Sequence, residues 1–150
     1  MSIKVYLAGS CSSENRTMMK EIASLLRDWE YDVYCPFELK IENAWDMPQE
    51  EWARKVFEKD IEAIDACDVF LMISPGRIGT AGTNWEQGYA YAKDKRIEVI
   101  QYTKDQTSLM TYCAADGFVN CTEDELPAMA LAAVDEVSHF SSNVCETVLT

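Results

Sequence analysis

The chain has 150 residues, of which 48% are hydrophobic and 26% are charged, a composition typical of one globular domain with a substantial core and unlike that of a disordered chain. The 26 acidic residues against 13 basic ones give a net charge of −13, which disfavours a nucleic-acid polymer as partner because phosphate contacts need a basic surface. No apolar stretch reaches the ~20 residues that span a bilayer, and the N-terminus lacks a signal-peptide pattern, so we expect no membrane contact and a cytoplasmic location.

Strand and helix signals alternate along the chain, which predicts an α/β fold with a parallel sheet and helices on both faces. The expected strands are residues 3–8, 31–35, 68–74 and 97–102, with a short one at 118–119. The expected helices are one capped by Ser12 or Ser13, then 49–66, 83–93 and 123–137. Residues 38–48 are predicted to be irregular. We expect a single domain over 1–150, with a core at about 3–138 and a polar tail at 139–150 that frays or docks on a neighbour.

Apolar residues at helical spacing predict which faces of the first two helices are buried. In the first helix they are Met18, Ile22, Leu25, Leu26 and Trp29. In the second they are Ala53, Val56, Phe57, Ile61 and Ile64.

The six cysteines are scattered and form no Cys-x-x-Cys pair, and His139 is the one histidine. This pattern argues against a zinc site and against a disulfide framework. Free thiols in a reducing compartment are the simplest interpretation, and we expect neither a metal nor a cofactor.

A glycine-rich loop follows the apolar strand at 68–74 and leads into the third helix, with the sequence Gly79-Thr80-Ala81-Gly82-Thr83-Asn84-Trp85-Glu86-Gln87-Gly88-Tyr89. The loop brings Glu86 near a helix N-terminus at the carboxyl end of a strand, where ligands bind in open α/β sheets. A first-turn acid favoured by the helix dipole is the plainer alternative.

Asp60 lies on or beside the apolar stripe of the second helix, among Val56, Phe57 and Ile64. A carboxylate in that position is either exposed at the edge of the stripe or held in a cleft with a raised pKa. Asp65 and Asp68 are interpreted more simply as turn and strand-entry residues.

The loop after the first strand contains the small residues Gly9 and Ser10 and ends near Arg16. Small residues let the backbone approach a ligand, and the helix N-terminus favours an anion. The loop matches neither a P-loop nor Gly-x-Gly-x-x-Gly. Cys11 is a poor candidate nucleophile because no histidine is placed to activate it. The loops after the strands at 3–8 and 68–74 would then lie with Asp60 and Glu86 at the carboxyl ends of the strands. A pair of carboxylates is typical of enzymes that cleave glycosidic bonds.

Four segments resemble the nucleoside 2-deoxyribosyltransferase family: Tyr6 to Ser10, Asp60, Gly79 to Ala90 and Ser108 to Met110. The resemblance implies a flavodoxin-like, doubly wound, five-stranded parallel sheet. It implies that Glu86 is the nucleophile of a covalent deoxyribosyl intermediate and that Tyr6 orients it. It also implies that Asp60 contacts the base and assists its departure, and that Ser108 and Met110 enter the site of a neighbouring subunit. The protein is therefore expected to be a homodimer or a higher multiple.

The sequence departs from this family at two positions. Members that exchange bases on unphosphorylated nucleosides typically carry aspartate at the position of Thr80 and asparagine at that of Ser108. The related deoxynucleoside 5′-monophosphate N-glycosidase branch has small hydroxyl residues at both. An aspartate would repel a 5′-phosphate, whereas Thr80, Gly82, Ser108 and Arg16 would accept it, so a phosphorylated substrate is slightly favoured.

Two other functions remain open at this stage. The chain could be a nucleotide-binding module that kept the pocket without turnover, although an intact Glu86 argues against this. It could also be a redox protein of flavodoxin-like fold, although the glycine-rich loop does not match a flavin phosphate loop. These residues do not distinguish a hydrolase from a transferase, nor a preference for purine bases from one for pyrimidine bases.

Overall fold

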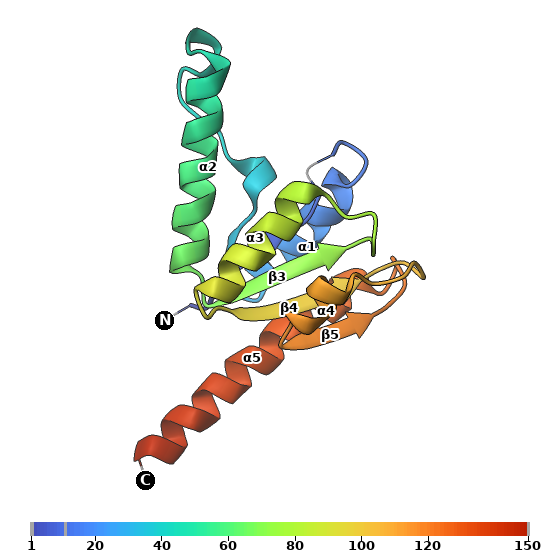
Figure 1. The fold of residues 1–150 in the computed structure, drawn as a ribbon. Coiled ribbons are helices and arrows are strands. Elements are labelled where there is room, and N and C mark those ends of the chain that lie inside the picture. Colours follow the sequence, from blue (N-terminus) through green and yellow to red (C-terminus); the bar gives the residue numbers. More distant parts are fainter. Residues whose placement is uncertain (1, 11, 150) are drawn as a thin grey trace.

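A computed structural model describes residues 2–10 and 12–149 of the chain, with side chains described up to His139. Five parallel strands form one sheet in the order β2-β1-β3-β4-β5 (Figure 1). The strands are β1 (Lys4–Ala8), β2 (Asp32–Tyr34), β3 (Val69–Ser74), β4 (Arg96–Gln101) and β5 (Gly117–Asn120). The predicted α/β class and five-stranded parallel sheet are confirmed.

Five α-helices of the described residues pack on the two faces of the sheet. They are α1 (Arg16–Asp28), α2 (Gln49–Ala66), α3 (Ala81–Ala92), α4 (Leu109–Cys113) and α5 (Leu126–Leu149). The segment predicted to be irregular, residues 38–48, contains one short 3₁₀ turn, Ala44–Asp46, and a second one, Pro36–Glu38, ends at its first residue. No helix in the described part of the chain combines the length and apolarity needed to cross a membrane.

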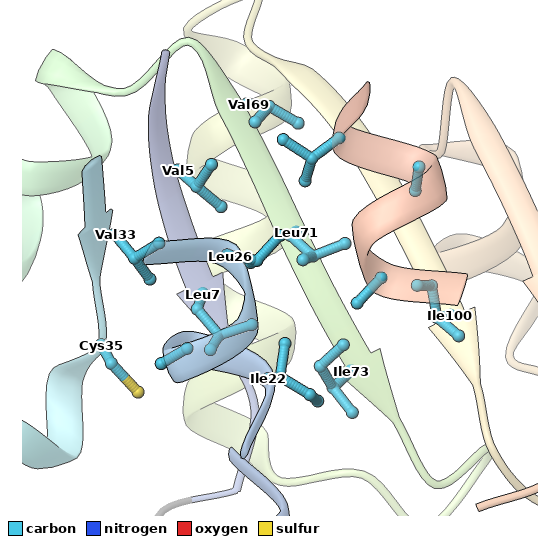
Figure 2. Packing of buried hydrophobic residues seen from close by; sticks show 14 of the residues in the cluster. Val5, Leu7, Ile22, Leu26, Val33, Cys35, Val69, Leu71, Ile73 and Ile100 are labelled. Atoms are coloured by element: carbon cyan, nitrogen blue, oxygen red, sulfur yellow. The ribbon is translucent and has the colours of Figure 1, made fainter. Parts of the chain in front are cut away.

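The central strand β3 is buried along its whole length and separates two cores. Its alternating side chains point to opposite faces. Val69, Leu71 and Ile73 pack with α1 and α5, as Figure 2 shows for part of this cluster. Phe70 and Met72 pack on the other face with Tyr6 and with residues of α2 and α3. Full burial of an apolar side chain contributes about 1.5–3 kcal/mol, so this strand anchors the domain.

Helix α1 begins later than its predicted cap. Asn15, and not Ser12 or Ser13, occupies the N-cap position, and it makes no side-chain capping bond. The buried positions are Met19, Ile22, Ala23 and Leu26, whereas Trp29 at the C-cap is exposed. Of the expected apolar positions, Ile22 and Leu26 are buried, and Met18 and Leu25 are partly buried.

Helix α2 has the predicted bounds but not the predicted burial. Of the five expected core residues only Ile64 is buried, Ala53 is exposed, and Phe57 keeps 48% of its surface exposed. Figure 1 shows why, because the N-terminal end of α2 extends beyond the sheet. The prediction of a continuous buried face was wrong, since only the last turns of the helix reach the sheet.

Two C-terminal features also differ from the prediction. Helix α4 had no expected counterpart, and α5 continues to Leu149 rather than ending near Val137. The predicted polar tail is therefore helical in its backbone as far as the structure describes it.

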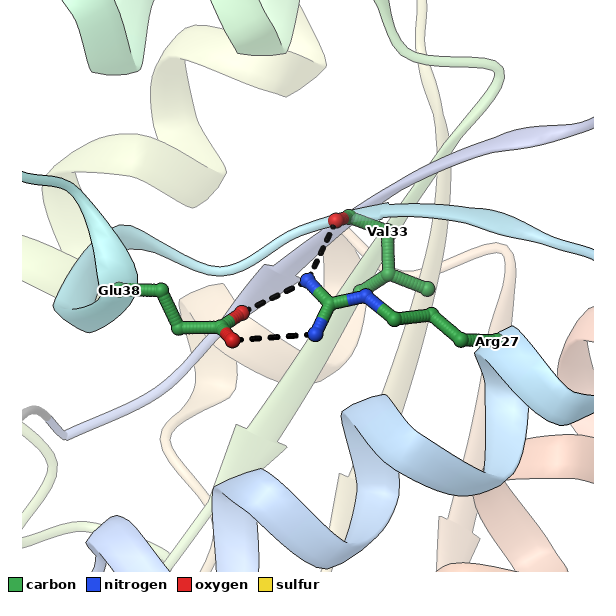
Figure 3. Close-up of polar contacts among 3 residues, drawn as sticks. All are labelled: Arg27, Val33 and Glu38. Atoms are coloured by element: carbon green, nitrogen blue, oxygen red, sulfur yellow. Dashed lines mark hydrogen bonds and ion pairs between the residues drawn. The ribbon is translucent and has the colours of Figure 1, made fainter.

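The edge strand β2 is tied to α1 by one arginine (Figure 3). The Arg27 guanidinium donates to both carboxylate oxygens of Glu38 at 2.7 and 3.0 Å and to the Val33 carbonyl at 2.9 Å. Both side chains are partly exposed, so the pair adds little net stability. Its bidentate geometry nonetheless fixes the segment that follows β2.

Candidate active site

Glu86 lies on α3, one turn after the start of the helix, and faces the sheet. The Thr80 hydroxyl caps the helix by accepting from the Thr83 N–H at 3.4 Å, and the two threonine hydroxyls lie 2.7 Å apart. The hydroxyl of Tyr6, a fully buried residue of β1, donates to the Glu86 carboxylate. The sheet thus supplies a rigid donor that orients the carboxylate of the helix.

The surroundings favour a protonated Glu86. Burial raises the pKa of this carboxyl from its ordinary value of 4.5 to about 7, partly opposed by the Tyr6 hydrogen bond and reinforced by the negative charge of Asp60. Burial and the nearby Glu86 charge also raise the pKa of Tyr6, which keeps its hydroxyl a donor. No ion pair among the described residues includes Glu86 or Asp60. A carboxyl with a pKa near neutrality is typical of catalytic sites.

Asp60 is half-buried on α2, and its Oδ1 accepts a hydrogen bond from the Tyr34 hydroxyl at 2.8 Å. Burial raises the pKa of Asp60, and the Tyr34 hydrogen bond opposes that shift. Of the two positions that the sequence allowed, the edge of the stripe and a cleft, Asp60 occupies the cleft.

Asp60 and Glu86 open on one cavity between α2 and α3, with a volume of about 370 Å³. This is within the usual size range of small-molecule sites. The residues that line it are Phe57, Asp60, Ile61, Ile64, Gly82, Trp85 and Glu86. A methyl group added at Gly82 would meet no atom within 4 Å other than its chain neighbours and the backbone of its own helix, so this position leaves the cavity open.

An aromatic pair forms part of the cavity wall. The rings of Phe57 and Trp85 lie 5.5 Å apart at 53°, and each side chain is about half exposed. Phe57 was expected in the core, and no role was predicted for Trp85. Trp85 directly precedes Glu86 and Phe57 lies one helical turn before Asp60, and this proximity was the available signal.

The predicted anion loop after β1 does not line this cavity in the described residues. Gly9 has a structural reason to be glycine, because a Cβ there would lie 2.8 Å from the Met19 Cε of α1. The Ser10 hydroxyl accepts from the Ser12 N–H at 3.3 Å. Arg16 is exposed at the first position of α1.

Ser108 and Met110 lie on the other side of α3 from the carboxylates. Ser108 is the N-cap residue of α4, and Met110 is 76% exposed. Met110 lines a groove of about 320 Å³ between α3 and α4, together with Asn84, Gln87 and Tyr91. These two residues do not join Asp60 and Glu86 within one chain.

No group of three or more His, Cys, Asp or Glu side chains within residues 2–10 and 12–139 is arranged to hold a metal ion. The site as described consists of two carboxylates, two tyrosine hydroxyls and an aromatic wall.

Solved structures with the same fold include enzymes of glycosyl transfer. A 2-deoxyribosyltransferase from the psychrotolerant bacterium Bacillus psychrosaccharolyticus superposes with a TM-score of 0.63 at 27% identity, covering 77% of this chain and 84% of that one. A conserved protein from Enterococcus faecalis has a TM-score of 0.60 at 22% identity, over 87% and 98% of the chains. The Clostridium botulinum CMP N-glycosidase BcmB has a TM-score of 0.58 at 18% identity, over 84% and 96%. The last two establish only the fold.

No curated protein matches this sequence at a significant level. A sequence model described as nucleoside 2-deoxyribosyltransferase, however, matches residues 5–137. That match includes both carboxylates, both tyrosines and all five strands except Lys4, the first residue of β1. The chain therefore belongs to the nucleoside 2-deoxyribosyltransferase family.

Proposed function

We propose that this protein cleaves the N-glycosidic bond of 2′-deoxynucleosides or, by slight preference, of their 5′-monophosphates, through a covalent deoxyribosyl intermediate on Glu86. One observation carries the proposal: the partly buried Glu86 carboxylate is held by Tyr6 and shares a cavity with Asp60. Membership of the family supports glycosyl transfer of this type.

The proposed reaction has two displacements at C1′ of the sugar. A Glu86 oxygen attacks C1′ while the bond from C1′ to the base nitrogen breaks, and the bond electrons leave with the base. Asp60 hydrogen-bonds the base and assists its departure, by proton transfer where the base needs it. Water or a second base then attacks C1′ and frees the Glu86 carboxylate. Tyr6 holds Glu86 in place and stabilises its ionised form.

The phosphate preference rests on the residues around the start of α3. Thr80 is uncharged and Gly82 leaves space, and the first N–H groups of a helix attract anions. Gly9, Ser10, Arg16 and Ser108 are the other proposed substrate contacts, Ser108 from a neighbouring subunit. One protein of the same fold is named a CMP N-glycosidase, and the substrate in that name is a nucleoside monophosphate.

Chromatography of free base tests this function directly. The protein is incubated with each deoxynucleoside and each deoxynucleoside 5′-monophosphate, with and without a second base. We expect base release from at least one substrate, and a new nucleoside when transfer occurs. Binding of these compounds without release of base would instead identify a nucleotide-binding module.

Thr80→Asp is expected to reverse the preference for the phosphorylated substrate. The new charge would repel a phosphate dianion, so kcat/KM for the monophosphate should fall by about 10- to 100-fold relative to that for the nucleoside. Aspartate is also a good N-cap, so α3 should keep its start. The measurement is kcat/KM for one nucleoside and its monophosphate in both proteins.

Thr80→Asn is the matched control, because asparagine has the shape and capping ability of aspartate without its charge. It should leave the ratio of the two kcat/KM values close to that of the unmodified protein. If the unmodified protein prefers the bare nucleoside, or if both variants change the ratio equally, the phosphate assignment is wrong.

We also propose a homodimer, or a multiple of one, whose sites are shared. Leu109, Met110 and Tyr112 of α4 are 75%, 76% and 56% exposed, beside Tyr91 of α3 at 63%. Such an apolar surface on α3 and α4 suits a contact between copies. Light scattering should give at least twice the mass of one chain.

Mixing two inactive variants tests the shared site. Glu86→Ala lacks the proposed nucleophile, and Met110→Asp alters the exposed residue proposed to enter the partner's site. A mixed dimer has one site with both changes and one with neither, so activity should reappear on mixing. An active monomer, or no recovery when mixed dimers have formed, would contradict sharing.

A further inference from the structure

Two tyrosines of neighbouring strands lie side by side beneath the candidate active site. Tyr34 of β2 is the register partner of Tyr6 of β1, and their rings stack with centroids 5.5 Å apart at 22°. Tyr6 also stacks on Phe70, its partner on β3, at 5.4 Å and 7°. Register partners on adjacent strands point to the same face, so a row of three aromatic rings crosses the sheet.

Each tyrosine hydroxyl of this row donates to a different carboxylate. Tyr6 donates to Glu86 on α3, and Tyr34 donates to Asp60 on α2 at 2.8 Å. The two carboxylates share one cavity. The arrangement is thus a pair of equivalent contacts, of which only the one to Glu86 was expected from the sequence.

Asp60 needs such a contact because α2 provides little constraint of its own. Apart from Ile64 the side chains of α2 are exposed or only half-buried. A carboxylate on such a helix would sample several rotamers, and each misplacement weakens its contact with a substrate. The Tyr34 hydroxyl comes from the sheet, which is the rigid part of the molecule, and it donates a hydrogen bond to Oδ1 of Asp60. Oδ2 accepts no hydrogen bond from another described residue and is available to a base.

We propose that Tyr34 is a positioning residue that holds Asp60 in the geometry required for departure of the nucleobase. The inference rests on the proposed function, because it gives Asp60 its role. A purely structural alternative is that the contact only ties α2 to β2, so the test needs readouts that such a tie would not change.

Electrostatics supplies one of these readouts. The groups that face Asp60 are Tyr34 of β2, Tyr6 of β1 and Glu86 of α3. The Tyr34 hydroxyl stabilises the ionised form of Asp60, so it lowers a pKa that burial raises. Removing the hydroxyl should therefore move the pKa of Asp60 upward.

The experiment is Tyr34→Phe, which removes the hydroxyl and keeps the ring stacked on Tyr6. We expect kcat to fall by about 10-fold or more with KM nearly unchanged, because the contact acts on the geometry of reaction rather than on binding. Carbon-13 NMR of labelled aspartate, recorded without substrate, should show a higher pKa for Asp60. The limb of the pH–kcat/KM profile that belongs to Asp60 should move to higher pH.

Tyr31→Phe is the matched control. Tyr31 also donates to an aspartate of a helix, Asp135 of α5, at 3.0 Å, but on the opposite face of the sheet. It should lose similar thermal stability while keeping kcat and the pH profile. Incorporating 3-fluorotyrosine at position 34 keeps the ring and provides a more acidic, stronger donor, so the pKa of Asp60 should fall.

The outcomes separate the two proposals. If Tyr34→Phe has the kcat of the unmodified enzyme and Asp60 keeps its pKa, Tyr34 is not a positioning residue, although the enzyme stays active. If the unmodified protein releases no base from any nucleoside or nucleotide, the proposed function fails, and the role of Tyr34 fails with it. Should Tyr34→Phe not fold, an unchanged pKa of Asp60 in the fluorotyrosine protein would overturn the inference.

Discussion

Glu86→Ala is expected to lower the turnover number for base release by about 10⁴-fold or more while the protein stays folded. The reason is that Glu86 forms a bond to the sugar in the proposed intermediate, and water bound in its place cannot do so. The side chain lies on α3 between the sheet and the cavity, and alanine is a good helix former, so the fold should persist. Single-turnover base release and circular dichroism measure the two parts of this expectation.

The pH dependence has a defined sign. The ionised carboxylate attacks, and the pKa of Glu86 is raised to about 7. In the unmodified enzyme kcat/KM should therefore be low at acidic pH and should rise as the pH increases through about 7.

Sodium azide should restore part of the activity of Glu86→Ala, since a small anion can occupy the vacated space and attack C1′. Glu58→Ala, an exposed change on α2, should leave turnover unchanged. A folded Glu86→Ala protein that releases base at the normal rate would disprove covalent catalysis.

Asp60→Asn is expected to have the second largest effect, a fall in kcat of about 10²- to 10⁴-fold. The amide oxygen can still accept from Tyr34, so the contact at 2.8 Å is preserved while the proton and the charge are lost. The loss should be greatest for bases that must be protonated to leave. Comparing kcat for several bases in the variant and the unmodified enzyme measures this dependence.

The same variant should change Glu86. The Asp60 charge is one cause of the raised pKa of Glu86, so its removal should lower that pKa and move the acid limb of kcat/KM to lower pH. Asp65→Asn is the matched control, because Asp65 is exposed on the same helix and accepts from the Tyr89 hydroxyl at 2.8 Å. Equal losses in Asp65→Asn and Asp60→Asn would show that the effect comes from the helix and not from the site.

Local patterns along the chain predicted the five strands and four of the five helices of the described residues, although not every helix boundary. The bounds of α2 and the core of β3 followed from apolar periodicity and from a short apolar run with turn residues around it. The burial of α2 did not follow, because periodicity identifies an apolar face but not what covers it. Helix α4 was missed because Leu109 to Cys113 is too short for a periodic signal.

Glu86 and Asp60 were singled out by their own positions in the sequence, whereas the role of Tyr6 came only from the family resemblance. Glu86, Asp60 and Tyr6 were named in advance, and the structure brings them together. Tyr34 was not named, since its contact joins residues 26 positions apart and depends on the register of β2 against β1. Composition and spacing do not contain that register, and the same holds for the Phe57–Trp85 ring contact.

The partly buried carboxyl of Glu86 also affects the stability of the folded protein. The folded state binds the Glu86 proton up to a pH of about 7, whereas an ordinary glutamate releases it near 4.5. Between these values the folded state holds more protons than the unfolded chain, so the free energy of unfolding decreases as the pH rises, by at most about 1.4 kcal/mol per pH unit. Ionising Glu86 makes the nucleophile available and weakens the fold at the same time. The pH of greatest activity and the pH of greatest stability are therefore drawn apart by a single side chain.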